Sequence, residues 1–101
     1  MTELTWSPRS VADLEEIRTF IEADSPAWAD LTVRRVVAAV ERLQQFPDSG
    51  RMVPERHSPD LREVISGNFR IVYRRRTTTV EIATVFRWSR DFSALTDSHS
   101  V

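Results

Sequence analysis

The sequence predicts an α+β domain of the order β-α-α-β-β-β, in which a helical hairpin packs on a small antiparallel sheet. Apolar residues recur at helical spacing in the first half of the chain, and the period changes to two after Pro47. A Ser-Pro pair, a typical helix start, precedes each helical stretch. The 101 residues leave room for one domain, placed at 1–95, and a polar tail at 96–101 that we expect to be frayed.

The two helices are predicted to follow a short first strand at 3–7. The Ser-Pro pair at 7–8 starts a helix near 8–24, and the pair at 25–26 starts a second helix near 26–46. Because the link between these helices is short, they must pack antiparallel, as a hairpin.

Three further strands are predicted in the second half of the chain. A polar loop at 51–60 is followed by strands near 61–66, 69–76 and 79–87. The links between these strands are only a few residues long, and such links require antiparallel pairing.

The composition argues against several classes of site. The chain has no cysteine, and its two histidines, His57 and His99, are far apart in sequence and lack metal-ligand spacing. We therefore expect no metal and no cofactor. No stretch reaches the roughly 18 uncharged residues of a membrane span, and the N-terminus lacks signal-peptide features, so we expect a cytoplasmic protein without a membrane partner.

The basic residues are all arginine. The chain has 14 of them and no lysine, and seven arginines but only two acidic residues lie between Arg62 and Arg90. The planar guanidinium suits phosphate and carboxylate oxygens, so this half of the chain could meet nucleic acid or an acidic protein segment. Solvated strand faces balanced by the acidic helices explain the same composition.

Several segments in order resemble the ParE/RelE toxin superfamily. The resemblance runs from Trp6 to about Arg90. The residues that carry it are Trp6-Ser7-Pro8, Asp13-Leu14, Ile17, Pro47, Gly50-Arg51, Leu61-Arg62-Glu63-Val64 and Asn68-Phe69-Arg70-Ile71-Val72-Tyr73-Arg74. The predicted element order also matches the helical hairpin on a sheet that is typical of this superfamily.

The resemblance implies the toxin of a type II toxin–antitoxin, or plasmid stabilisation, system. Such a toxin forms a hetero-oligomer with a co-expressed antitoxin, here expected to be ParD-like, whose C-terminal segment folds on binding. ParE-like members are associated with poisoning DNA gyrase, whereas RelE-like members cut messenger RNA on the ribosome.

The chemistry of RNA cleavage distinguishes these two branches. Cleavage at a 2′-hydroxyl needs groups that accept and donate protons and cations that stabilise the phosphorane. RelE-like enzymes resemble one another in a Lys/Arg cluster with a C-terminal tyrosine, or in a His-Tyr pair with a glutamate. Here Arg87 stands where many members carry histidine, and arginine is a poor proton shuttle. The single tyrosine, Tyr73, lies in mid-strand, where we interpret it as a packing residue.

We therefore expect a ParE-like toxin that binds and poisons its target and is not itself an enzyme. The first alternative is a RelE-like ribosome-dependent endoribonuclease, whose catalytic set would be Arg51, Arg62, Arg70 and Arg87. The second is an inactive toxin fold that serves only complex formation and operon regulation.

Two sets of contact residues are predicted. The antitoxin set is Ile17, Ile21, Trp28, Val33, Val37, Arg70 and Arg74. The target set is Arg62, Arg74, Arg87, Trp88 and Arg90. Within the sheet, Glu63 is expected to pair with an arginine of a neighbouring strand, and Arg62 to join Arg70 and Arg74 in one positive patch.

Overall fold

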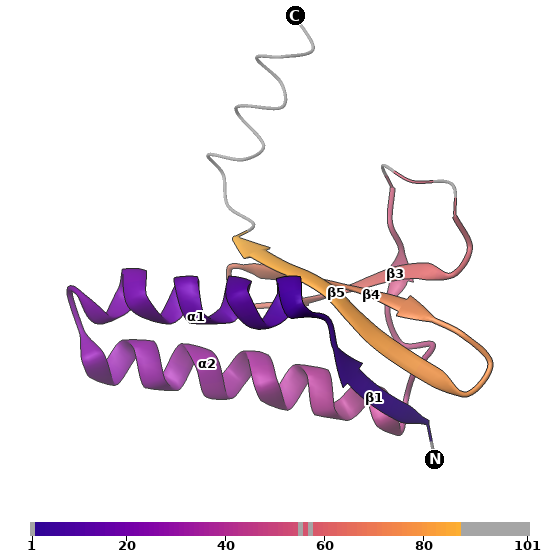
Figure 1. Ribbon diagram of the computed structural model, residues 1–101, viewed down its shortest axis with the longest axis horizontal. Coiled ribbons are helices and arrows are strands. Elements are labelled where there is room, and N and C mark those ends of the chain that lie inside the picture. Colours follow the sequence, from indigo (N-terminus) through magenta and orange to yellow (C-terminus); the bar gives the residue numbers. More distant parts are fainter. Residues whose placement is uncertain (1, 55, 57, 88–101) are drawn as a thin grey trace, which may run out of the picture.

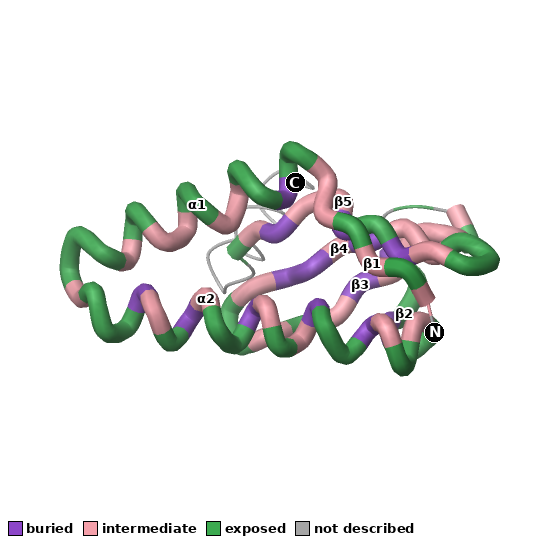
Figure 2. Tube along the Cα trace, turned by 60° about the horizontal axis from the view of Figure 1, so that its bottom comes forward, coloured by how far each residue is buried: buried purple, intermediate pink, exposed green. Residues whose placement is uncertain are grey.

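The computed structural model describes residues 2–54, 56 and 58–87, in which a helical hairpin lies against a mixed sheet (Figure 1). The elements are β1 (Glu3–Trp6), α1 (Pro8–Glu22), α2 (Pro26–Glu41), a 3₁₀ turn η1 (Arg42–Gln44), β2 (Arg51–Met52), β3 (Leu61–Ser66), β4 (Phe69–Arg75) and β5 (Thr79–Arg87). The tip of the hairpin extends beyond the sheet in both Figure 1 and Figure 2. The α+β class and the helical hairpin are thus confirmed.

Both helices begin where the Ser-Pro pairs predict. The Ser7 hydroxyl accepts a hydrogen bond from the Ser10 amide at 3.0 Å, and the Ser25 hydroxyl accepts one from the Trp28 amide at 3.2 Å. Each serine satisfies an amide that has no partner within its helix. The predicted ends at 24 and 46 are too late. Helix α1 ends at Glu22, and α2 ends at Glu41 and tightens into η1 before Pro47, which disfavours helical geometry in the residue before it.

The sheet has the order β1-β5-β4-β3-β2 within the described residues, and β1 runs parallel to β5. The prediction of a wholly antiparallel sheet is therefore wrong for this one pair. Short links fix the directions of β3, β4 and β5, which pair antiparallel as predicted. The link from β1 passes through the whole hairpin, so loop length places no limit on the direction of β1.

A second correction concerns the loop predicted at 51–60. Arg51 and Met52 form the short strand β2, which pairs with β3 at the edge of the sheet. Two residues are too few to show an alternating pattern, so the strand leaves no signal in the sequence.

Strand β5 contains a bulge that reverses its alternation. Val72 pairs with Thr84 and Tyr73 pairs with Ile82, so Ala83 is the extra residue. Helix α1 covers this irregularity. The Ser7 hydroxyl donates to the Ala83 carbonyl at 2.9 Å, and the Asp13 carboxylate accepts from the Val85 amide at 3.1 Å and from the Thr84 hydroxyl.

The core lies between α2 and the central strands, as the buried positions in Figure 2 show. Its fully buried members are Val36, Val40, Leu43, Ile71, Tyr73, Val80, Ile82 and Val85. Packing in the core thus stabilises α2, although its β-branched residues have low helix propensity. No helix among the described residues is long and apolar enough to cross a membrane.

Candidate functional site

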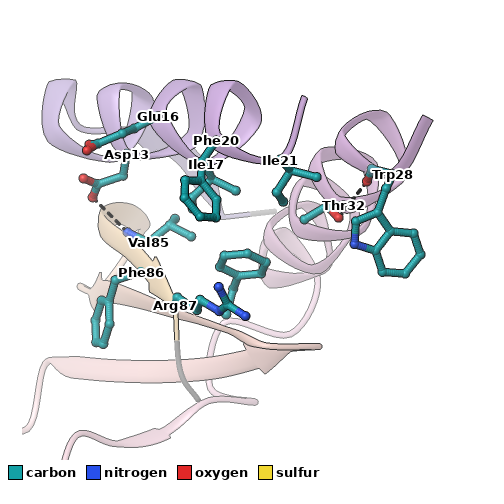
Figure 3. A pocket seen from close by; sticks show the side chains of 11 residues that line it. Asp13, Glu16, Ile17, Phe20, Ile21, Trp28, Thr32, Val85, Phe86 and Arg87 are labelled. Carbon is teal, nitrogen blue, oxygen red and sulfur yellow. Dashed lines mark hydrogen bonds between the residues drawn. The ribbon is translucent and has the colours of Figure 1, made fainter. Parts of the chain in front are cut away.

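A pocket of about 410 Å³ lies between the projecting hairpin and the ends of β4 and β5 (Figure 3). We call it the hairpin pocket. Helix α1 lines it with Asp13, Glu16, Ile17, Phe20 and Ile21, α2 with Trp28 and Thr32, and the sheet with Phe69, Val85, Phe86 and Arg87. The pocket exists because the hairpin is longer than the strands beneath it, so the tips of the helices have no sheet to pack against.

Two large aromatic side chains at this pocket are strongly exposed. The exposed fraction is 69% for Phe20 and 53% for Trp28. The guanidinium carbon of Arg35 lies 5.8 Å from the centre of the Trp28 ring and supports one side of it. Exposed aromatics that gather at a hollow are typical of protein-binding surfaces.

The structure divides the predicted antitoxin set among three places. Ile17, Ile21 and Trp28 line the hairpin pocket. Val33 and Val37 line a separate shallow groove, together with Val11 and Leu14 of α1. Arg70 and Arg74 lie instead on the face of the sheet that the helices leave uncovered. Phe20, which the sequence analysis missed, is more exposed than any of the predicted apolar residues in the pocket.

Arg87 also lines the hairpin pocket, whereas Arg74 of the same predicted target set lies on the uncovered face of the sheet. The Cα of Arg87 lies opposite Phe69, which puts Arg87 on the helix side of the sheet. The bulge at Ala83 is the reason. Alternation counted from buried Ile82 would direct Arg87 to the uncovered face, and one extra residue reverses that direction.

The predicted ion pair of Glu63 is confirmed, and two arginines share this buried carboxylate. Arg51 reaches one oxygen at 2.7 Å, and Arg70 donates from Nε to the other at 3.0 Å. Arg70 is itself only 2% exposed and stacks on Phe86, with its guanidinium carbon 5.1 Å from the ring centre. Charge reversal at Arg70 would therefore disturb the interior of the protein.

The prediction that Arg62 joins Arg70 and Arg74 in one patch is wrong. Arg62 lies opposite Tyr73, a residue of the core under the helices, and donates to the Gly50 carbonyl at 2.9 Å. The uncovered face, which we call the open sheet face, carries Arg56, Arg70 and Arg74 around Leu61, Val72 and Phe86. Arg74 there pairs with Asp60 at 3.0 Å. The hydrogen bond from the Ser58 hydroxyl, and after it the one from Arg74, holds the pKa of Asp60 below its usual value.

Tyr73 is confirmed as a packing residue. Its side chain is fully buried, its hydroxyl donates to the Pro47 carbonyl at 2.8 Å, and the same oxygen accepts from the Gly50 amide at 3.0 Å. Burial raises the pKa of the phenol above its ordinary value. A Cβ at Gly50 would lie 2.5 Å from this hydroxyl, so the close approach requires glycine.

The four arginines of the alternative catalytic set do not converge. Arg51 and Arg70 meet at Glu63, Arg62 lies on the other face of β3, and Arg87 lies in the hairpin pocket. Trp88, Arg90, His57 and His99, together with the tail at 96–101, fall outside the described residues. Among the described residues, no group of three acidic or histidine side chains is placed to hold a metal ion.

Proteins with similar sequences include toxins. The family model of the ParE toxin of the type II toxin–antitoxin system parDE matches residues 4–92. The candidate toxin Y4kP of Sinorhizobium fredii is 35% identical over 81% of this chain and 83% of its own length. Toxin RelE2 of Caulobacter vibrioides is 32% identical over 64% of this chain and 69% of its own length.

A solved structure agrees with the sequence relatives. A chain of the chromosomal ParDE toxin–antitoxin system from P. aeruginosa superposes with a TM-score of 0.73 and 25% identity, over 88% of this chain and 98% of that one. The match covers the hairpin and the sheet, the elements that form both the hairpin pocket and the open sheet face. The chain described here belongs to the ParE toxin family of type II toxin–antitoxin systems.

Proposed function

We propose that this ParE-family toxin acts by binding its target without cleaving RNA, that the target is DNA gyrase, and that a ParD-like antitoxin neutralises it by occupying the hairpin pocket. DNA gyrase is proposed as the target because the chain resembles ParE-like toxins. A binding mode of action is supported by one observation: the four arginines of the alternative catalytic set lie apart from one another, and Tyr73 is buried. Acid–base catalysis needs groups that converge on one reacting phosphate.

The hairpin pocket supports the antitoxin part of the proposal. Its exposed Phe20 and Trp28 would be covered by an apolar segment from a partner, with a gain of about 25 cal/mol for each Å² of apolar surface removed from water. A segment that folds on binding loses conformational entropy, so it needs an apolar surface of this kind.

The open sheet face supports the target part. It is available on the side opposite the hairpin, and its arginines surround apolar side chains. A large partner with acidic groups would fit such a surface, because arginine and apolar side chains lie side by side on it.

RelE-like cleavage is the second candidate function, because toxin RelE2 is among the relatives. One experiment with two arms separates the two. The purified chain is added to DNA gyrase with supercoiled plasmid, and in parallel to ribosomes programmed with messenger RNA. We expect trapped double-strand breaks in the plasmid and intact messenger RNA. Codon-specific RNA cleavage without gyrase trapping would support RelE-like activity instead.

A matched pair of variants tests whether the open sheet face contacts gyrase. Arg74→Glu changes the open sheet face and should weaken gyrase trapping. Arg34→Glu makes the same charge change on α2, where the Arg34 side chain is 76% exposed, and should leave trapping unchanged. Equal effects of both variants would argue against the open sheet face as the target surface.

A further inference from the structure

The hairpin pocket holds two charged side chains of opposite sign on opposite walls. Glu16 comes from α1, and Arg87 comes from the end of β5 (Figure 3). Both residues are exposed, and neither side chain has an ion pair or a hydrogen bond with another described residue. The third charged group, Asp13, already binds Arg9, Thr84 and the Val85 amide. Glu16 and Arg87 are therefore the charges that an occupant of the pocket can still engage.

Apolar side chains lie between these two charges. Figure 3 shows Ile17 and Phe20 pointing from α1 toward the sheet, and Trp28 at the far end of the pocket from Asp13 and Glu16. An occupant must therefore present apolar groups along its length and charged groups at its borders. That combination describes an amphipathic segment.

The backbone around the pocket favours a helix over an added strand. Strand β1 pairs with β5 only as far as Ile82, so β5 continues past its neighbour. Beyond that point the Ala83 carbonyl is already bound by Ser7, and the Val85 amide by Asp13. An incoming strand would find these backbone groups occupied, whereas a helix satisfies its own backbone and needs only side-chain contacts.

We propose that the hairpin pocket selects its partner helix by charge: Arg87 binds an acidic side chain, and Glu16 binds a basic one, on either side of an apolar stripe that covers Phe20 and Trp28. This inference rests on the proposed function, in which an antitoxin segment occupies the pocket. It removes Arg87 from the target-binding residues and makes Arg87 and Glu16 determinants of antitoxin specificity.

The test uses three synthetic helical peptides of about 18 residues, long enough to form helix on the pocket surface. They share one apolar stripe and differ at two border positions. These positions carry Glu and Gln in the acidic peptide, Gln and Lys in the basic peptide, and Gln and Gln in the neutral peptide. Their dissociation constants are measured by fluorescence anisotropy against the full chain and its variants. Each peptide carries at most one of the two charges. The comparison therefore holds whichever way the peptide helix runs along the pocket.

Charge reversal on the protein should affect the peptides selectively. We expect Arg87→Glu to weaken the acidic peptide by about tenfold, and Glu16→Arg to weaken the basic peptide by a similar factor. The neutral peptide should bind all of these proteins equally. Glu15→Arg is the matched control, since Glu15 lies next to Glu16 but lines the separate groove on α1, and it should change none of the three affinities.

Trp28→Ala distinguishes failure of this inference from failure of the proposed site. If Trp28→Ala weakens all three peptides but the charge variants weaken none selectively, charge selection is wrong and the pocket remains the binding site. If no peptide binds, or if Trp28→Ala has no effect on peptides that do bind, the hairpin pocket is not the partner site, and both statements are overturned. Gyrase trapping is measured separately and does not depend on either result.

Discussion

At the scale of single residues, Glu63 joins the edge of the sheet to its interior. Its carboxylate has no exposed surface and binds Arg51 on β2 and Arg70 on β4. A buried carboxylate is tolerated because both its oxygens have cationic partners. Arg70 in turn stacks on Phe86, which lines both the hairpin pocket and the open sheet face.

Replacing Glu63 should therefore strongly destabilise the protein. We expect Glu63→Gln to lower the free energy of unfolding by about 3–5 kcal/mol, because the Arg70 guanidinium stays buried without this carboxylate. Arg34→Ala is the control, since the Arg34 side chain is 76% exposed and the loss of its surface ion pair with Asp30 should cost at most about 1 kcal/mol. Denaturant unfolding measures both, and equal costs for the two variants would contradict the role assigned to Glu63.

Tyr73 predicts how stability depends on pH in the alkaline range. Burial raises the pKa of its phenol, whereas in the unfolded chain the value is about 10. The contribution of this group is fully present below pH 10. As the pH rises from about 10 toward the raised folded pKa, the unfolded chain releases a proton that the folded chain retains, so the free energy of unfolding falls.

This effect can be measured without interference from other side chains. The chain has no lysine, no cysteine and a single tyrosine, so no other side chain has a reference pKa near 10. Denaturant unfolding at several pH values above 9 should show the fall in the natural chain. In Tyr73→Phe the fall should vanish, and stability at neutral pH should drop by about 1–3 kcal/mol because the Gly50 amide loses its acceptor. A pH dependence that persists in Tyr73→Phe would refute this assignment.

At the scale of elements, hydrogen bonds to Asp13 hold α1 against β5 at the bulge. We expect Asp13→Ala to destabilise the protein by about 1–3 kcal/mol, because the Val85 amide and the Thr84 hydroxyl lose their acceptor. Glu16→Ala, one turn further along the same helix, should change stability by no more than about 0.5 kcal/mol. Hydrogen exchange of the Val85 amide gives a local readout, and unchanged protection in Asp13→Ala would be inconsistent with this contact.

The elements that local signals determine could be predicted from the sequence, and those that depend on distant partners could not. The serine caps act within one helical turn, so both helix starts were predictable. The parallel direction of β1 depends on a connection through the whole hairpin. In β3 both alternating faces mix charged and apolar residues, so the pattern could not tell which face Arg62 occupies.

The candidate site was only partly predictable for the same reason. Ile17, Ile21 and Trp28 follow from helical spacing and line the hairpin pocket. The exposure of Phe20 depends on how far the hairpin projects past the sheet, which no local pattern records. The placement of Arg87 depends on the bulge at Ala83, and strict alternation over 79–87 assigns Arg87 to the wrong face.

At the scale of the whole molecule, the two candidate surfaces lie on different sides of the sheet. The hairpin pocket faces the helices, and the open sheet face looks away from them. Variants should therefore separate neutralisation from toxicity. We expect a Phe20→Ala, Trp28→Ala double variant to arrest growth as the natural chain does but to escape its antitoxin. Co-expression growth assays measure this, and normal rescue by the antitoxin would exclude these aromatics from the antitoxin contact.

The most direct test of the binding mode of action follows DNA synthesis and transcripts in the same culture after the toxin is induced without antitoxin. Labelled thymidine incorporation reports replication, and primer extension on translated messenger RNA reports cleavage. A gyrase poison predicts that DNA synthesis stops first while transcripts remain full-length. Codon-specific cleavage of transcripts, with DNA synthesis continuing, would contradict that mode of action and assign the chain to the RelE-like branch.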